Sequence, residues 1–467
     1  MRKQSFNITT IQEQRASSTA TNTVQESSSP RIEATVAGQF LRKLFQFLFY
    51  LHFILIAVLT IFLAIRGVVL SGKHHFQPKK WYPPLLASAA SAGILSLAWQ
   101  WMTQSKPSKA MRICFWLGPL MTCAFGILLL LINSAASLST GAVAIISGVI
   151  QSIYTCWVNP RFEYAGKILS VSAAFPPART AILVTLSIIL SAVYSSFLVS
   201  GIGGATAIGT TLDILFIVVI LLSLAWSMHV IKNVLLVTIS RVKYIHFAYG
   251  ADMETEIAFR DTIKYLMGSV YIGSVFVPIF GSIWGSARTI NAIAGERDEF
   301  LFSCADCYSA VASTLAAHGN RWGFVHVGVY NKGFIQASVD TWEMFKRAGM
   351  ETLINSDLTG AFCFFSGVAG GAVSALVGGT WALAVHKSYA TEVSIYTFLI
   401  GYFMFRTATA WPLACVSAYY VAYAENPLHP RFDSTIPARI QELQRYQNEQ
   451  IASPDPAQLW EQYQAPE

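Results

Sequence analysis

Arg406 is the residue of this sequence whose position most suggests a chemical role. It lies near the middle of the long apolar run Val393 to Ala424. A charged side chain inside such a run is costly and usually marks a pathway or a buried ion pair. Because a guanidinium repels a cationic ligand, we expect Arg406 to have a structural or gating partner, either Asp357 or the C-terminal end of a helix.

Asn233 holds a comparable place in a second apolar run, next to His229 and Lys232. Two interpretations are open. In the first, the three side chains line the cytoplasmic mouth of a passage. In the second, they end an interfacial helix, with Lys232 extending its ammonium group to the lipid head groups.

Motifs for catalysis and for cofactor binding are missing from the sequence. Cys304 and Cys307 form a C-x-x-C pair, but no second pair stands at the spacing of a zinc site. The glycines at 201–204 and 367–379 contain no GKS or GKT and follow no predicted strand, which argues against a nucleotide loop. We therefore expect a protein that is not an enzyme and that uses no metal and no cofactor.

The composition places these residues in membrane helices. Of the 467 residues, 54% are hydrophobic and 12% are charged, whereas soluble domains carry about 25% charged residues. Several apolar runs approach the ~20 residues that cross a bilayer as a helix. The net charge of +7 comes from scattered basic residues that form no stripe, so we expect the lipid bilayer as a partner and no nucleic acid.

The apolar runs predict an all-α, polytopic membrane bundle. Residues 1–38 should be a disordered cytoplasmic tail, 39–426 the transmembrane domain and 427–467 a cytoplasmic tail. The strong predicted spans cover residues 44–65, 83–103, 113–132, 141–158, 181–200, 212–239, 265–286, 358–384 and 393–424.

Particular residues indicate how some of these spans should be joined and packed. The third and fourth should form a tight hairpin, and the GIGG at 201–204 should form a flexible turn. Gly367 and Gly371 form a GxxxG face, which is typical of closely packed membrane helices.

Residues 304–330 decide whether the spans number nine or ten. This stretch is weakly apolar and contains Asp306, His318, Arg321 and His326. If it crosses as a weak eighth span, both termini are cytoplasmic and more basic connections lie inside, as the positive-inside rule favours. The alternative is a surface or re-entrant helix. We expect about ten spans.

Three segments resemble a known family. VIKNVLLVTISRV at Val230–Val242 and NRWGFVHVGVYNKGF at Asn320–Phe334 are similar to segments of choline transporter-like proteins, and AYAENP near Ala422 is similar to their terminal motif. The sequence from Asp340 to Gly360 resembles the fungal and plant, Pns1-like branch. Asn331 departs from the pattern, because the family usually has Gly there.

The resemblance implies a transporter of choline or a related organic cation, without ATP, in the plasma membrane. A quaternary ammonium group donates no hydrogen bond, so aromatic faces should hold it. Trp226, Tyr271 and Trp411 are the candidate substrate-binding residues, at a midplane site that alternates its access. The other interpretation of these three residues is packing between helices.

The sequence therefore leaves two functions open. A carrier requires a solvent-reachable aromatic cavity between the sixth, seventh and tenth spans. A non-transporting scaffold or lipid-interacting bundle requires only close packing. The sequence leaves the substrate, the coupling ion, the direction of transport and the oligomeric state open.

Overall fold

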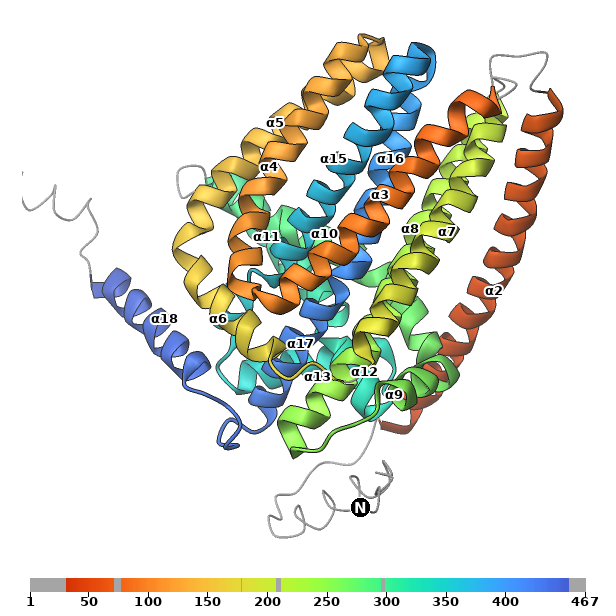
Figure 1. Cartoon of the computed structure of the whole chain (residues 1–467). Coiled ribbons are helices and arrows are strands. Elements are labelled where there is room, and N and C mark those ends of the chain that lie inside the picture. The colour runs from red at the N-terminus through yellow and green to blue at the C-terminus, as the bar shows by residue number, and fades with distance from the viewer. Residues whose placement is uncertain (1–30, 71–76, 178, 207–210, 295–298, 453–467) are drawn as a thin grey trace, which may run out of the picture.

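A computed structural model describes residues 31–70, 77–177, 179–206, 211–294 and 299–452, and the described chain is helical without strands (Figure 1). The helices are α2 (Arg31–Leu70), α3 (Pro78–Ser105), α4 (Pro107–Ile132), α5 (Ala135–Val158), η1 (Asn159–Arg161), α6 (Phe162–Ala173), α7 (Thr180–Ala205), α8 (Thr211–Tyr249), α9 (Thr255–Asp261), η2 (Thr262–Leu266), α10 (Met267–Ala294), α11 (Glu299–His318), α12 (Gly323–Tyr330), α13 (Phe334–Arg347), α14 (Glu351–Asn355), α15 (Thr359–Val385), α16 (Lys387–Ala408), α17 (Ala410–Glu425) and α18 (Thr435–Ala452).

The predicted helical membrane fold is confirmed. Nine helical stretches of the described chain are long and apolar enough to cross a bilayer. The outer helices also leave large apolar side chains uncovered: Ile54 of α2, Val149 of α5 and Leu190 of α7 are all more than half exposed. Such side chains suit contact with lipid acyl chains.

The predicted tails are described only in part. Residues 1–30 and 453–467 lie outside the described residues. Residues 31–38 begin α2, so this part of the expected disordered tail is helical. In the C-terminal tail, Thr435–Ala452 forms α18, whose low apolar content agrees with a position outside the membrane.

The predicted hairpin of the third and fourth spans is present as α4 and α5. Asn133 adopts the left-handed conformation at the end of α4, and Ser134 caps the start of α5. A Cβ atom on Gly141 would lie 2.9 Å from the carbonyl oxygen of Gly126. The two helices therefore meet backbone to backbone.

The glycines at 201–204 were expected in a turn, and this prediction is wrong. They are helical and form the last turn of α7. A Cβ atom on Gly204 would lie only 2.0 Å from the carbonyl oxygen of Leu63 in α2. These glycines therefore allow close packing between α7 and α2.

The final predicted span is two helices. α16 ends at Ala408 and α17 begins at Ala410. Pro412 has no N–H to donate to Ala408, which explains the break. Residues 410–423 of α17 are buried throughout, so this helix lies at the centre of the bundle.

The weak span expected over residues 304–330 is also not one helix. α11 ends at His318 and α12 begins at Gly323. Between them, the Asn320 side chain accepts a hydrogen bond from the N–H of Gly323 (3.0 Å) and donates one to the carbonyl of Ser338 (2.9 Å). Asn320 thus holds the turn between α11 and α12, where a continuous span was predicted. Whether this region crosses the membrane stays a prediction.

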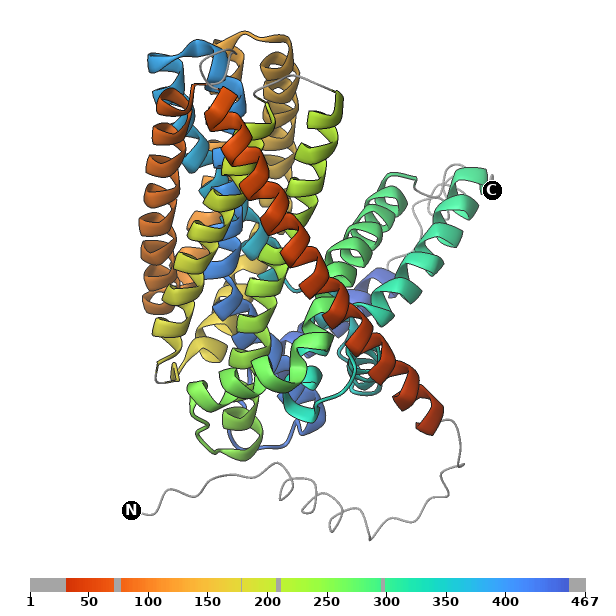
Figure 2. The same ribbon diagram turned by 90° about the vertical axis from the view of Figure 1, so that its right-hand side faces the viewer.

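α10 and α11 pack against each other as a hairpin. In Figure 2 this hairpin, in green and teal, leans away from the upper part of the main bundle. α10 also contacts α2 and α8.

Candidate functional site

A partly open cavity of about 950 Å³ lies between α8, α10, α15 and α16. Its lining also includes residues from the end of α5, from η1 and α11, from the segment 319–358, and from α17. Cavities that bind small organic molecules have volumes of roughly 300–1,000 Å³. This cavity is thus large enough for a small organic ligand, and it lies between the sixth, seventh and tenth predicted spans.

The wall contributed by α10 includes two glycines beside the larger side chains of Val277 and Trp284. Pro278 lies inside this helix, followed by Gly281 and Gly285 on the cavity side. A Cβ atom added to either glycine would meet nothing within 4 Å. These glycines therefore face open space, unlike the close-packed glycines of α7 and α15.

Two basic side chains face the cavity without an acidic partner. Lys232 of α8 is 7% exposed, and Arg406 of α16 keeps its Nε atom buried without a hydrogen-bond partner. Within the described chain, neither residue forms an ion pair. The predicted pathway position of Arg406 agrees with this placement, although its role stays a prediction.

The suggested pairing of Arg406 with Asp357 is wrong. Asp357 pairs with Arg321 instead, and it also accepts hydrogen bonds from the N–H (3.2 Å) and hydroxyl (2.8 Å) of Thr359. The Arg321 guanidinium lies over the Trp322 ring, 4.4 Å from its centroid. The Asp357 carboxylate is therefore already neutralised.

Glycines of α15 make room for both arginines. A Cβ atom on Gly367 would lie 2.9 Å from Cδ of Arg406, and one on Gly360 would lie 2.1 Å from Nη1 of Arg321. The predicted close packing at Gly367 and Gly371 is also confirmed, because a Cβ on Gly371 would approach the carbonyl oxygen of Phe398 to 2.7 Å. The glycines of α15 therefore allow close packing on α16 and leave room for the side chains of Arg321 and Arg406.

Asn233 lines the cavity and also ties two of its walls together. Its Nδ2 donates to the Ser274 hydroxyl of α10 at 3.0 Å, while its Oδ1 is buried without a partner. The residue is 1% exposed. Its contact with α10 joins two walls of the cavity, and a structural or gating role of Asn233 stays a prediction.

Trp226 and Tyr271 come together in the structure but do not line the cavity. Phe49 of α2 stacks on Tyr271 with ring centroids 4.2 Å apart and meets Trp226 edge-on at 5.2 Å. His52 lies 4.9 Å from Trp226. The two residues therefore pack α2, α8 and α10 against one another in this conformation, and their contact with a substrate stays a prediction.

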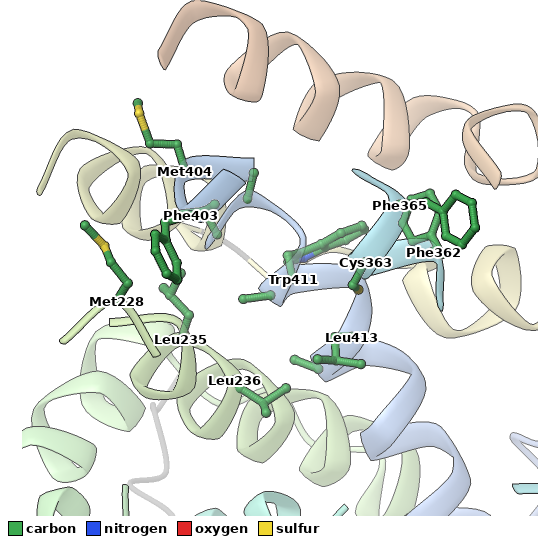
Figure 3. Packing of buried hydrophobic residues seen from close by; sticks show 14 of the residues in the cluster. Met228, Leu235, Leu236, Phe362, Cys363, Phe365, Phe403, Met404, Trp411 and Leu413 are labelled. Atoms are coloured by element: carbon green, nitrogen blue, oxygen red, sulfur yellow. The ribbon is translucent and has the colours of Figure 1, made fainter. Parts of the chain in front are cut away.

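Trp411 is 1% exposed and packs in the interior (Figure 3). Figure 3 shows it in the region of Cys363 and Leu413, two residues that line the cavity. The Cys363 thiol donates to the carbonyl of Thr409, near Trp411, at 3.5 Å. Trp411 therefore stands behind the cavity wall, and its role as a ligand also stays a prediction.

Other aromatic residues line the cavity and were not selected from the sequence. These include Trp284 of α10, Tyr402 of α16 and Trp342 of α13. Trp284 lies near the end of a predicted span, a position that is typical of the membrane interface. Trp284 follows Pro278 and stands between Gly281 and Gly285, and this Pro and Gly content of the span was the available signal. A fourth, Trp157, lies under the guanidinium of Arg161 at 4.9 Å.

A second polar cluster, also missed from the sequence, joins α8, α12 and α17 at the partly buried carboxylate of Glu425. Tyr244 and Tyr330 donate to this carboxylate, the latter at 2.8 Å, and His326 Nε2 lies 3.2 Å from it. Glu425 belongs to the AYAENP motif, so two of the motifs that carry the resemblance meet here. The cluster fixes these helices together outside the cavity.

Comparison with known proteins supports the resemblance. A family model described as "Plasma-membrane choline transporter" matches residues 142–428, which is more than half of the chain. Protein PNS1 of Mycosarcoma maydis is 25% identical over 263 residues, 53% of this chain and 50% of that protein. Protein PNS1 of Gibberella zeae is 23% identical over 333 residues, 68% of this chain and 57% of that protein.

A CTL-like protein of Dictyostelium discoideum is 23% identical over 216 residues, 44% of this chain and 38% of that protein. The chain spans about half the length of the fungal relatives it matches. With the helical membrane fold and the shared segments around Asn233, Asn320 and Glu425, these matches identify the chain as a member of the choline transporter-like family, in its Pns1-like branch.

Proposed function

We propose that this protein is a transporter that moves a small organic amine, choline or a related cation, through the cavity between α8, α10, α15 and α16. The observation that supports this most directly is the cavity itself. A carrier needs space for its cargo between these helices, whereas a scaffold or lipid-interacting bundle needs none. Membership in a transporter family favours the same function.

In this proposal the amine is held by aromatic faces. Trp284 and Tyr402 line the cavity from α10 and α16, and a desolvated cation over such a ring gains about 1–2 kcal/mol. A rearrangement of α10 would separate Tyr271 from Phe49 and alter the surroundings of Trp226. After such a rearrangement, Trp226 and Tyr271 would be able to contact the substrate, as the sequence predicts.

Alternating access would depend on α10. Pro278 removes one backbone hydrogen bond from this helix, and the neighbouring glycines leave its cavity face unpacked. A hinge here would let the α10–α11 hairpin move relative to α15 and α16. For a cargo with one net positive charge, the membrane potential contributes about 2.3 kcal/mol per 100 mV.

We also propose that both termini lie in the cytoplasm and that the protein resides in the plasma membrane. In Figure 1 the start of α2 and the end of α17 lie at the same, lower end of the bundle, which supports termini on one side. The distribution of basic connections favours the cytoplasmic side. The name of the matched family favours the plasma membrane.

Uptake of labelled choline into vesicles that contain the purified protein tests this function. We expect saturable uptake by the wild type, and about tenfold lower uptake for Trp284→Ala and Tyr402→Ala. Trp101→Ala is the matched control, because Trp101 is 71% exposed and does not line the cavity. The variants Trp226→Ala and Trp411→Ala test the site predicted from the sequence.

Absence of wild-type uptake for choline and for related amines, in vesicles that hold correctly folded protein, would contradict the carrier and favour the scaffold. Equal losses for Trp284→Ala and Trp101→Ala would contradict the position of the pathway.

A further inference from the structure

The charge of the cavity suits a ligand that carries an anionic group beside its amine. Its described lining residues include four strongly basic side chains, and these are Arg161, Lys232, Arg321 and Arg406. The one carboxylate among those lining residues is Asp357, which is already paired with Arg321. Lys232, Arg161 and Arg406 therefore leave a positive surplus, which favours an organic cation that also carries an anionic group over one that carries none.

The unpaired positive charges lie at buried positions, where a charge is energetically costly. Removing a charged group from water without a partner is strongly unfavourable, so buried charges are normally paired. Lys232 is more than nine-tenths buried, and neither it nor Arg406 has an ion-pair partner within the described chain. An anionic group that enters the cavity would supply the missing compensation.

The basic side chains come from different helices that surround one space. Lys232 is on α8, Arg406 on α16, and Arg161 ends the short η1 after α5. Gly367 of α15 accommodates the stem of Arg406 at the cavity wall. Such convergence is what recognition of phosphate oxygens requires, since guanidinium and ammonium groups donate several charge-assisted hydrogen bonds.

We propose that the ligand of this cavity carries a phosphate group as well as an amine, with the phosphate held by Lys232 and Arg406 and the amine by the aromatic faces of Trp284 and Tyr402. This rests on the proposed function, of which it names the substrate class. Two sources share this chemistry: a soluble phosphate ester of an amino alcohol, and the head group of a membrane phospholipid.

Binding of labelled phosphocholine to the purified full chain in detergent tests the proposal, with choline and inorganic phosphate as competitors. We expect phosphocholine to bind at least about tenfold more tightly than choline, and inorganic phosphate to compete. Lys232→Gln and Arg406→Gln should each weaken binding by about tenfold or more. Lys109→Gln and Arg112→Gln are the matched controls, because both residues are exposed on α4 and do not line the cavity.

Lys232→Arg and Arg406→Lys preserve the charge and should retain most of the affinity, which separates loss of charge from loss of folding.

The amount of phospholipid that stays bound through purification distinguishes the two sources of the ligand. If the head group is the ligand, wild type should retain a phospholipid that the Lys232→Gln/Arg406→Gln double variant loses. If the ligand is soluble, the two proteins should retain equal phospholipid and differ only in phosphocholine binding.

Choline binding that equals phosphocholine binding, or that strengthens when Lys232 and Arg406 are neutralised, would overturn the proposal. Choline uptake without any binding of phosphocholine would overturn it and leave the proposed function intact. Phosphocholine binding in a protein that transports none of these compounds would support the phosphate site and contradict the proposed transport function.

Discussion

At the scale of single residues, position 331 shows how backbone conformation selects a side chain. Asn331 ends α12 with φ 52°, in the left-handed region that Gly and Asn tolerate best. This explains why Asn can stand where the family usually has Gly. Arg42 of α2 donates to the carbonyl oxygen of Asn331 at 2.7 Å and to its Oδ1 at 3.1 Å.

We expect Asn331→Gly to leave the unfolding temperature nearly unchanged, because Gly keeps both the conformation and the backbone acceptor. Asn331→Ala should destabilise the protein by about 1–2 kcal/mol, since Ala is strained in the left-handed region. Thermal unfolding in one detergent measures both. Equal destabilisation by Gly and Ala would show that the side-chain contact with Arg42 governs this position.

At the scale of helices, the contact between α7 and α2 has almost no spare space. The carbonyl oxygen of Leu63 occupies the position next to Gly204. A backbone atom cannot move aside as the end of a flexible side chain can, so an added methyl group must separate the helices.

We therefore expect Gly204→Ala to destabilise the protein by about 1–3 kcal/mol. Gly38→Ala in α2 is the control, because a Cβ atom there meets nothing within 4 Å. That change should be neutral or slightly stabilising, since Ala favours helix. Thermal unfolding compares the two, and equal effects would contradict the close contact.

The break in the hydrogen bonding of α10 predicts a kinetic effect. Pro278→Ala restores the missing N–H and should stiffen the helix. We expect a lower maximal uptake rate with little change in the affinity for cargo, because Pro278 contributes an apolar ring and no charge to the cavity. Saturation curves of uptake separate the two quantities. An unchanged rate would remove α10 as the moving element.

The positions of the helices were largely predictable, and their interruptions were not. Apolar runs place the nine strong spans because hydrophobic length is a local property. The break at Asn320 and the helical state of the GIGG segment depend on contacts with other helices. Gly204 packs on Leu63, and Asn320 bonds to Ser338; neither contact is visible in the order of residues along the chain.

At the scale of the whole molecule, the cavity arises from the way α10 leans and from the rotation of each helix. The sequence identified Arg406 and Asn233, which line the cavity, because a polar group in an apolar run is unusual wherever it points. It could not separate Trp284 from Trp226, because an aromatic residue suits a helix interface as well as a ligand site. Whether a ring packs at a helix interface or lines the cavity depends on the direction in which it points, and this direction is set only in the assembled bundle.

The cavity as transport pathway is tested most directly by blocking it. Ser282 of α10 is exposed and lines the cavity, whereas Ser139 of α5 is exposed outside it. Vesicles containing Ser282→Cys, Ser139→Cys or wild-type protein are treated with N-ethylmaleimide, and uptake of labelled choline and phosphocholine is then measured. We predict that modification of Ser282→Cys reduces uptake at least about tenfold, while the other two proteins retain most of theirs. Full uptake by a completely modified Ser282→Cys protein would contradict the account.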